Sequence, residues 1–84
     1  MMKLLYFSWV RERIGCDEEE ITPPAGTDTV GALLAWLATR GPGYAAALTD
    51  RSALRVAVNQ AYADDSHPVA AHDEIALFPP VTGG

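Results

Sequence analysis

The pattern that most constrains this chain is one amphipathic stripe in the segment 27–41. Its apolar residues recur at the i, i+3, i+4, i+7 spacing of one helix face: Val30, Leu33, Leu34 and Leu37. Residues 27–29 (Thr-Asp-Thr) offer side-chain oxygens to the first amides, and Gly41 with Pro42 ends the helix. Gly31 should cost up to about 1 kcal/mol relative to alanine unless close packing requires it. A helix with one apolar face must bury that face against a second layer of secondary structure.

Short extended patterns supply that layer. The segment 2–10 is bulky and apolar on both alternating faces. In the segment 54–59 the large apolar residues Leu54, Val56 and Val58 come at every second position, which is the period of a strand with one face in the core. We predict strands at 2–10, 17–22, 54–59 and 74–78, a further short strand near 61–63, and a turn or two of helix at 44–48. Two opening strands followed by a crossing helix match the β-grasp arrangement. We therefore predict an α+β fold, with a mixed four- to five-stranded sheet covered by one main helix.

Size limits the chain to one hydrophobic core. Of its 84 residues, 49% are hydrophobic and 20% are charged, which is the composition of a globular domain. We predict one domain over residues 1–84, with an ordered core at about 1–78 and an extended C-terminal tail at 79–84.

The charge balance narrows the classes of partner. Eleven acidic residues against six basic ones give a formal net charge of -5. Nucleic acid and anionic lipid bind basic surfaces, so we expect partners with basic surfaces and neither nucleic acid nor membrane. The acidic run 17–20 is typical of a solvated face, and steering of basic partners is the alternative. Every apolar run is shorter than the roughly 18 to 20 residues of a membrane-spanning helix.

Candidate catalytic and metal-binding side chains are few. Cys16 is the single cysteine, which excludes an internal disulfide and a thiolate zinc site and suits a reducing cytoplasm. No histidine lies near it in sequence, so a nucleophilic role is not expected. His67 and His72 flank a proline-containing loop, and Asp64, Asp65 and Asp73 lie close to them in sequence. The spacing of these five residues fits no known ligand pattern, so a solvated loop is expected. We predict no catalytic side chain, no metal site and no permanently bound cofactor.

The end of the chain has a different character, and its last residues are Pro79, Pro80, Val81, Thr82, Gly83 and Gly84. Two prolines disfavour both helix and sheet ladder, so the segment should be extended and reach roughly 18 to 20 Å. Terminal glycines remove the side chains beside the carboxylate, and the main chain alone could then enter a narrow tunnel. This favours an arm whose carboxylate a partner enzyme activates. A frayed terminus is the alternative.

Three stretches carry a resemblance to a known family: Val10-Arg11-Glu12, Val58-Asn59-Gln60, and the closing dodecapeptide 73–84. With them the chain resembles, over essentially its whole length, the small sulfur-carrying subunit of molybdopterin synthase. The dodecapeptide is the specific part. A bare Gly-Gly would also fit a thiamine sulfur carrier, a transfer-RNA thiolation carrier or a ubiquitin-like modifier.

The resemblance implies a ubiquitin-like β-grasp fold and a sulfur cycle centred on Gly84. An adenylyltransferase similar to ubiquitin-activating enzymes would consume ATP and form a transient acyl-adenylate there. A sulfur donor, such as a cysteine desulfurase or a rhodanese-like protein, would then produce a thiocarboxylate. In a heterotetramer with the large synthase subunit, the tail would insert and donate sulfur to cyclic pyranopterin monophosphate (precursor Z). The inserting residues would be Pro80, Val81, Thr82, Gly83 and Gly84.

Catalytic side chains would then belong to the partners, and this chain would be a non-catalytic cytoplasmic subunit. By alternation Leu77 should point into the core, whereas Phe78 and Val81 should contact the partner. Two residues depart from the resemblance, because glycine is expected in place of His72 and an aromatic residue in place of Leu77. A plain interaction module with an incidental terminus stays open as an alternative.

Overall fold

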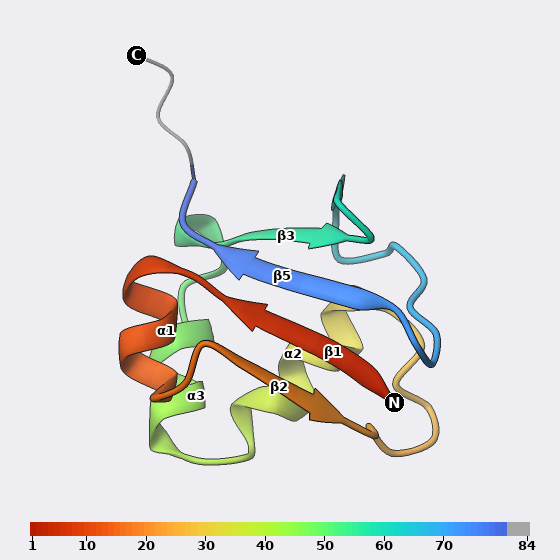
Figure 1. Ribbon diagram of the computed structural model, residues 1–84, viewed down its shortest axis with the longest axis horizontal. Coiled ribbons are helices and arrows are strands. Elements are labelled where there is room, and N and C mark those ends of the chain that lie inside the picture. The colour runs from red at the N-terminus through yellow and green to blue at the C-terminus, as the bar shows by residue number, and fades with distance from the viewer. Residues whose placement is uncertain (81–84) are drawn as a thin grey trace.

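The computed structural model describes residues 1–80, and Figure 1 shows how they are arranged. In order the elements are β1 (Met2–Tyr6), α1 (Ser8–Ile14), β2 (Glu18–Ile21), α2 (Val30–Ala38), α3 (Pro42–Leu48), the 3-10 helix η1 (Arg51–Ala53), β3 (Arg55–Val58), β4 (Ala61–Ala63) and β5 (Glu74–Phe78). None of the helices in this part of the chain is long and apolar enough to cross a membrane.

The strands form one mixed sheet of five, in the order β2-β1-β5-β3-β4. β1 and β5 run parallel, with Leu4 opposite Ile75 and Tyr6 opposite Leu77, and the other neighbouring strands are antiparallel. A parallel pair cannot be joined by a tight turn, and here almost the whole chain forms the crossover between them. The predicted α+β, β-grasp fold class is confirmed, and the last strand in sequence lies at the centre of the sheet.

The first strand is shorter than predicted, and a helix follows it. The chain turns at Ser8 (φ 54) and enters α1. Val10 is buried and Ile14, one turn later, packs against the core, which is a helical spacing. Gly15 (φ 100) closes this helix by donating its amide back into the last turn at 2.8 Å. The predicted continuation of the strand through Val10 was therefore wrong.

The predicted amphipathic helix is α2, which lies within shorter bounds. Thr29 caps it, because its side-chain oxygen accepts the amide of Ala32 at 3.2 Å. Gly31 is closely packed, since an added Cβ would lie 3.3 Å from the Cβ and carbonyl oxygen of Asp65 and would make those atoms give by a few tenths of an ångström. The Gly31 amide also donates to that carbonyl at 2.9 Å. Pro42 stands in the first turn of α3, where its missing amide hydrogen is not needed.

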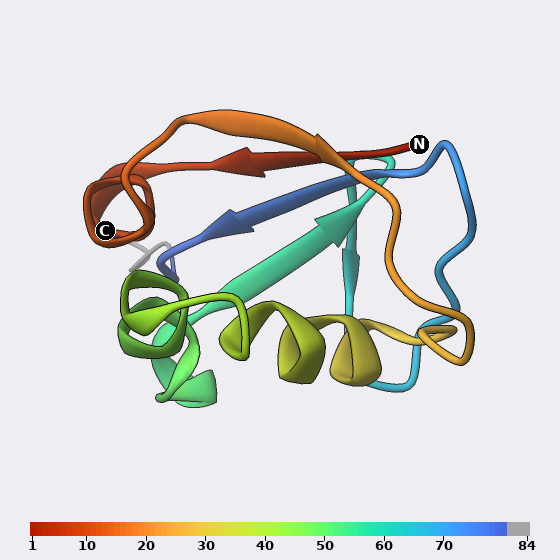
Figure 2. The same ribbon diagram turned by 90° about the horizontal axis from the view of Figure 1, so that it is seen from below.

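The helices lie on one side of the sheet, as Figure 2 shows. α2 runs along the sheet, while α1 and α3 pack together at one end of it. The strands direct alternate side chains toward the helices. The buried strand residues of this core are Met2, Leu4, Tyr6, Ile21, Val56, Val58, Ile75 and Leu77. Glu19, Ala61 and Ala63 share this helical side, because they lie opposite Leu4, Val58 and Val56. The alternate strand residues face the other side of the sheet, which no helix of residues 1–80 covers.

Left-handed backbone positions shape two loops that lie next to the start of β5: the turn between β3 and β4, and the loop that leads into β5. Asn59 (φ 51) and Gln60 (φ 73) form the two-residue turn between β3 and β4. The Asn59 side chain ties this turn to β5, because it accepts the amide of Glu74 and donates to the carboxylate of Asp73, both at 3.0 Å. His72 also has positive φ (73), which is the physical reason that glycine suits this position.

A polar cluster fastens β2 to the helical layer. Glu19 accepts hydrogen bonds from the hydroxyls of Tyr6 (2.8 Å) and Tyr44 (2.6 Å) and from the guanidinium of Arg40 (3.0 Å). Burial acts to raise the pKa of Glu19, but the hydrogen bonds from Tyr44, Tyr6 and Arg40 outweigh it and lower the pKa. Burial, together with the bond to Glu19, raises the pKa of Tyr44 to about 12. One carboxylate thus joins β1, β2 and α3.

Close packing of α3 on α1 yields a first prediction. A Cβ on Gly43 would overlap the carbonyl oxygen of Arg13, a backbone atom that cannot swing aside. Gly43→Ala should therefore lower the free energy of unfolding by about 1 to 3 kcal/mol, measured by urea denaturation. Gly41→Ala is the matched control, because its Cβ would make only an ordinary 3.8 Å contact with the Tyr44 ring. Equal stability of the two variants would contradict this packing.

The Glu19 cluster yields a second prediction. Glu19→Gln should reduce stability by about 1 to 3 kcal/mol at neutral pH, since bonds to a charged acceptor are the stronger ones. The folded-state pKa of Glu19 lies below its ordinary value of 4.5. Its contribution is therefore complete above that value and is lost as pH falls through the folded pKa.

The stability gap between wild type and Glu19→Gln should accordingly narrow as the pH falls below 4.5, when followed by urea denaturation. Glu20→Gln serves as the control, because Glu20 is exposed on the opposite face of the same strand. A gap that stayed constant from neutral to acidic pH would show that ionised Glu19 does not hold the cluster together.

Candidate functional site

The strand that leads into the C-terminal segment is held from both sides. β5 pairs with β1 and with β3, and Ile75 and Leu77 are fully buried. The amide of Phe7 donates to the Leu77 carbonyl at 3.1 Å, one residue before the strand ends at Phe78. Pro79 then has no amide hydrogen with which to continue a ladder. We call residues 79–84 the arm. The structure describes its first two residues, which leave the sheet from a central strand (Figure 1).

Beside the root of the arm, the helix-free side of the sheet is apolar. We call this surface the open patch; it consists of Leu5, Phe7, Ala57, Tyr62, Ala76 and Phe78. Phe7 is 45% exposed and Tyr62 is 74% exposed. Large apolar side chains gathered on one exposed surface mark a protein-binding site more often than chance placement does. The open patch and the arm therefore form one candidate functional site.

Two aromatic rings of the open patch meet across a strand. The ring centroids of Tyr62 on β4 and Phe78 on β5 are 5.8 Å apart, with the ring planes at 34°. Ala57, on the intervening strand β3, is only 8% exposed although it faces away from the helices. Next to the rings is a hollow of ≈ 390 Å³, lined by Arg55, Val56, Tyr62, Ala63 and Pro80. The beginning of the arm thus borders a hollow over β3 and β4.

The rest of this side of the sheet is charged. Three carboxylates, Glu18, Glu20 and Glu74, face it together with two cations, Lys3 and Arg55. Lys3 and Glu18 form an ion pair at 3.7 Å, but both side chains are about half exposed, so the pair adds little stability. The excess of carboxylates here gives a basic partner a long-range attraction toward the face that bears the open patch.

The predicted site residues fall into three groups. Leu77 points into the core, as predicted, and Phe78 points out onto the open patch, where a partner can reach it. Pro80 borders the hollow. The others lie outside the described residues, and their predicted roles stay predictions: Val81, Thr82, Gly83 and Gly84.

Other candidate side chains offer little chemistry. Burial, followed by the nearby charges of Glu19 and Asp17, raises the pKa of the Cys16 thiol, and a protonated thiol is a poor nucleophile. Among residues 1–80, His, Cys, Asp and Glu form no group of three that could hold a metal ion.

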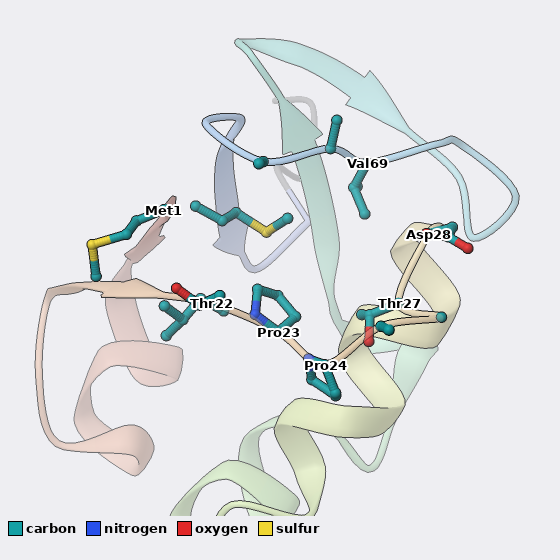
Figure 3. A pocket seen from close by; sticks show the side chains of 13 residues that line it. Met1, Thr22, Pro23, Pro24, Thr27, Asp28 and Val69 are labelled. Atoms are coloured by element: carbon teal, nitrogen blue, oxygen red, sulfur yellow. The ribbon is translucent and has the colours of Figure 1, made fainter.

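A second hollow, shown in Figure 3, lies at the opposite end of the sheet. It measures ≈ 210 Å³, and its lining includes Met1, Thr22, Pro23, Pro24, Thr27, Asp28 and Val69. It adjoins the first residues of β1, whereas the arm leaves beyond the last residue of β5. Because β1 and β5 run parallel, these are opposite ends, so this hollow is separate from the arm.

The sequence analysis missed two residues of the site, Phe7 and Tyr62. Phe7 was taken as part of a long strand, although alternation from a core-facing Tyr6 would have placed it outward. Tyr62 belongs to a three-residue strand whose facing is set by its pairing with Ala57. Such short strands carry too little periodicity to reveal which side they turn to the core.

Comparison with known proteins assigns the family. The model of the ThiS family matches residues 4–84. The molybdopterin synthase sulfur carrier subunit of Escherichia coli (strain K12) is 44% identical over 84 residues, which is 100% of each chain. Its counterpart of the same name in Haemophilus influenzae is 39% identical over 84 residues, again 100% of each.

One solved structure is similar in both fold and sequence. The crystal structure of H. volcanii small archaeal modifier protein 1 has a TM-score of 0.72 and 30% identity, covering 95% of this chain and 97% of that one. From the matches in sequence and in fold, the chain belongs to the ThiS family, among the molybdopterin synthase sulfur carrier subunits.

Proposed function

We propose that this chain carries sulfur for molybdopterin synthesis on the carboxyl group of Gly84. The observation that carries the proposal is the end-to-end match to a molybdopterin synthase sulfur carrier subunit, which includes Gly83 and Gly84. The geometry of the described residues supports it, because the arm begins at a strand paired on both sides. A carrier of this kind needs a firm body behind an extended reactive end.

The chemistry begins with an unreactive carboxylate. A partner adenylyltransferase joins the Gly84 carboxylate to the AMP part of ATP and releases pyrophosphate. A persulfide, supplied by a cysteine desulfurase or a rhodanese-like protein, then displaces AMP and forms an acyl disulfide. A thiol attacks the outer sulfur of that acyl disulfide, forms a new disulfide with it, and releases the thiocarboxylate. The anionic sulfur is the softer and better nucleophile, and the side chains that catalyse these steps belong to the partners. The compartment we propose is the cytoplasm, in keeping with a single cysteine.

The proposed acceptor complex is a heterotetramer with the large synthase subunit. That subunit covers the open patch, where Phe78 contributes to the interface, and residues 80–84 enter its active site with Val81 in contact. Two sulfurs, delivered to cyclic pyranopterin monophosphate by two loaded chains, complete the dithiolene. Exposed Phe7 and Tyr62 support docking at the open patch, and the neighbouring carboxylates favour a basic rim on the partner.

Protein modification is the second candidate. It is favoured by the similarity to small archaeal modifier protein 1, at 30% identity. In that reaction the activated Gly84 carboxyl would form an amide with a lysine amine and would not accept sulfur. Carriers for thiamine or transfer-RNA thiolation would share the activation step and differ in the final acceptor.

Activation of Gly84 can be tested by mass spectrometry. The chain, incubated with the adenylyltransferase, ATP and a sulfur source, should gain about 16 mass units, the difference between sulfur and oxygen, in the peptide that contains Gly84. The Escherichia coli relative serves as the positive control, and a chain that lacks Gly84 should gain at least about ten-fold less sulfur, because its end is one residue too short.

Three outcomes separate the candidates. No mass gain, in a mixture that loads the Escherichia coli relative, would contradict the sulfur-carrier proposal. Covalent adducts on lysines of other proteins, lost when Gly84 is removed, would favour modification. Rescue of molybdenum-enzyme activity in cells by the shortened chain would favour a plain interaction module.

Docking at the open patch gives a further prediction. Phe7→Asp should weaken binding of the large subunit by at least about 30-fold, since an aromatic anchor is replaced by a charge that binding would bury. The fold should tolerate the change, because Phe7 is the N-cap of α1 and aspartate is a favoured N-cap. Titration calorimetry with the large subunit measures the dissociation constant.

Ala46→Asp provides the matched control, because it adds the same charge to an exposed position of α3 on the helical side of the sheet. It should bind like the wild type. If Phe7→Asp binds the large subunit as tightly as this control, docking does not use the open patch.

A further inference from the structure

We propose that Tyr62 is a positioning residue that sets the direction in which the arm leaves the sheet, acting through its contact with Phe78. The inference rests on the proposed sulfur-carrier function, because the direction of the arm matters only if its end must reach a partner's active site. Tyr62 is 74% exposed and belongs to an edge strand far from the arm in sequence. Its role would therefore come from the tertiary contact alone.

The contact spans three strands. Tyr62 is opposite Ala57, and Ala57 is in turn opposite Ala76, so one small side chain separates the outer row of β4 from that of β5. The rings of Tyr62 and Phe78 close over this gap with their centroids 5.8 Å apart. The low exposure of Ala57, 8%, fits a residue covered by its aromatic neighbours. A larger residue at position 57 would hold the rings apart.

Phe78 is where such a contact has the greatest effect on the arm. It is the last residue of β5 and directly precedes Pro79 and Pro80. Proline rings fix φ, and a residue before proline is confined to extended conformations, so an orientation set at Phe78 is passed on to Pro79 and Pro80. If all six residues of the arm are extended, as the sequence predicts, the reach is roughly 18 to 20 Å, and a rotation of roughly 10° at the root would move the far end by about 3 Å.

A displacement of that size matters for chemistry. Misplacement of a reacting group by about 1 Å can slow a reaction about 100-fold. The hollow of ≈ 390 Å³ leaves room for the root to shift, since Tyr62 and Pro80 both form part of its wall. Removing the Tyr62 ring would enlarge that hollow and free Phe78 to turn toward β4. The aromatic contact therefore limits the directions open to the arm.

The first test separates binding from sulfur transfer. Thiocarboxylated wild type, Tyr62→Phe and Tyr62→Ala are mixed with the large subunit and the pterin precursor, and single-turnover transfer is followed at increasing concentrations of the large subunit. Tyr62→Ala should transfer sulfur at least about ten-fold more slowly even at saturation, because its end is misplaced within the complex. Tyr62→Phe keeps the ring and should transfer at the wild-type rate.

Phe7→Ala is the matched control on the same face, because it removes an aromatic ring of the open patch that is not part of the pair over Ala57. It should raise the dissociation constant and leave the saturated rate unchanged. If Tyr62→Ala behaves in this way too, Tyr62 is only a partner contact and the proposal is overturned.

A second test does not depend on sulfur chemistry. A nitroxide spin label is coupled through an amide to the Gly84 carboxyl, and the broadening of backbone amide signals in residues 1–80 is mapped by NMR. Wild type and Tyr62→Phe should broaden the same amides, and Tyr62→Ala should spread the broadening over more of the domain. An unchanged pattern in Tyr62→Ala would overturn the positioning role. The proposed function itself would instead fail if Gly84 gained no sulfur.

Discussion

The parallel pairing of β1 with β5 is the contact on which the rest of this structure depends. It brings the first and last strands of the described chain together at the centre of the sheet, and the whole intervening chain packs around that pair. Core-facing residues of both strands, Leu4, Tyr6, Ile75 and Leu77, are almost completely buried. A strand placed at the centre cannot tilt or slip without breaking two ladders. The end of β5 is therefore a firm base for whatever follows it.

The two sides of the sheet have different tasks. The helical side holds the fold together through the buried stripe of α2 and the carboxylate of Glu19, which three donors share. The other side exposes the large apolar side chains of Phe7 and Tyr62 to solvent next to the arm. Their exposure does not stabilise the isolated domain, which indicates that a partner covers them. The separation leaves one face of the sheet free for a partner while the other face holds the fold together. That free face carries the open patch, which a partner can bind, and it lies beside the start of the arm.

Prediction from sequence succeeded where local patterns are strong. Helix α2 followed from the spacing of Val30, Leu33, Leu34 and Leu37, and β5 was predicted with its observed bounds, because prolines mark its end. α1 was missed, because Trp9 and Val10 continue a bulky apolar run that suits a strand as well as a helix. The change of structure depends on Ser8, whose left-handed backbone has no signature in its residue type.

The sequence alone was sufficient for the fold class, which follows from a helical stripe among short extended patterns, and for the family, which follows from the closing dodecapeptide. That residues 79–84 form an extended arm stays a prediction from two prolines and two glycines. The tertiary structure alone determined that the arm starts from the central strand, that Phe7 and Tyr62 share its side of the sheet, and that Tyr62 meets Phe78 across Ala57. The reason is physical. Alternation along a strand divides side chains into two sets, but only long-range pairing and the packing of helices decide which set is covered.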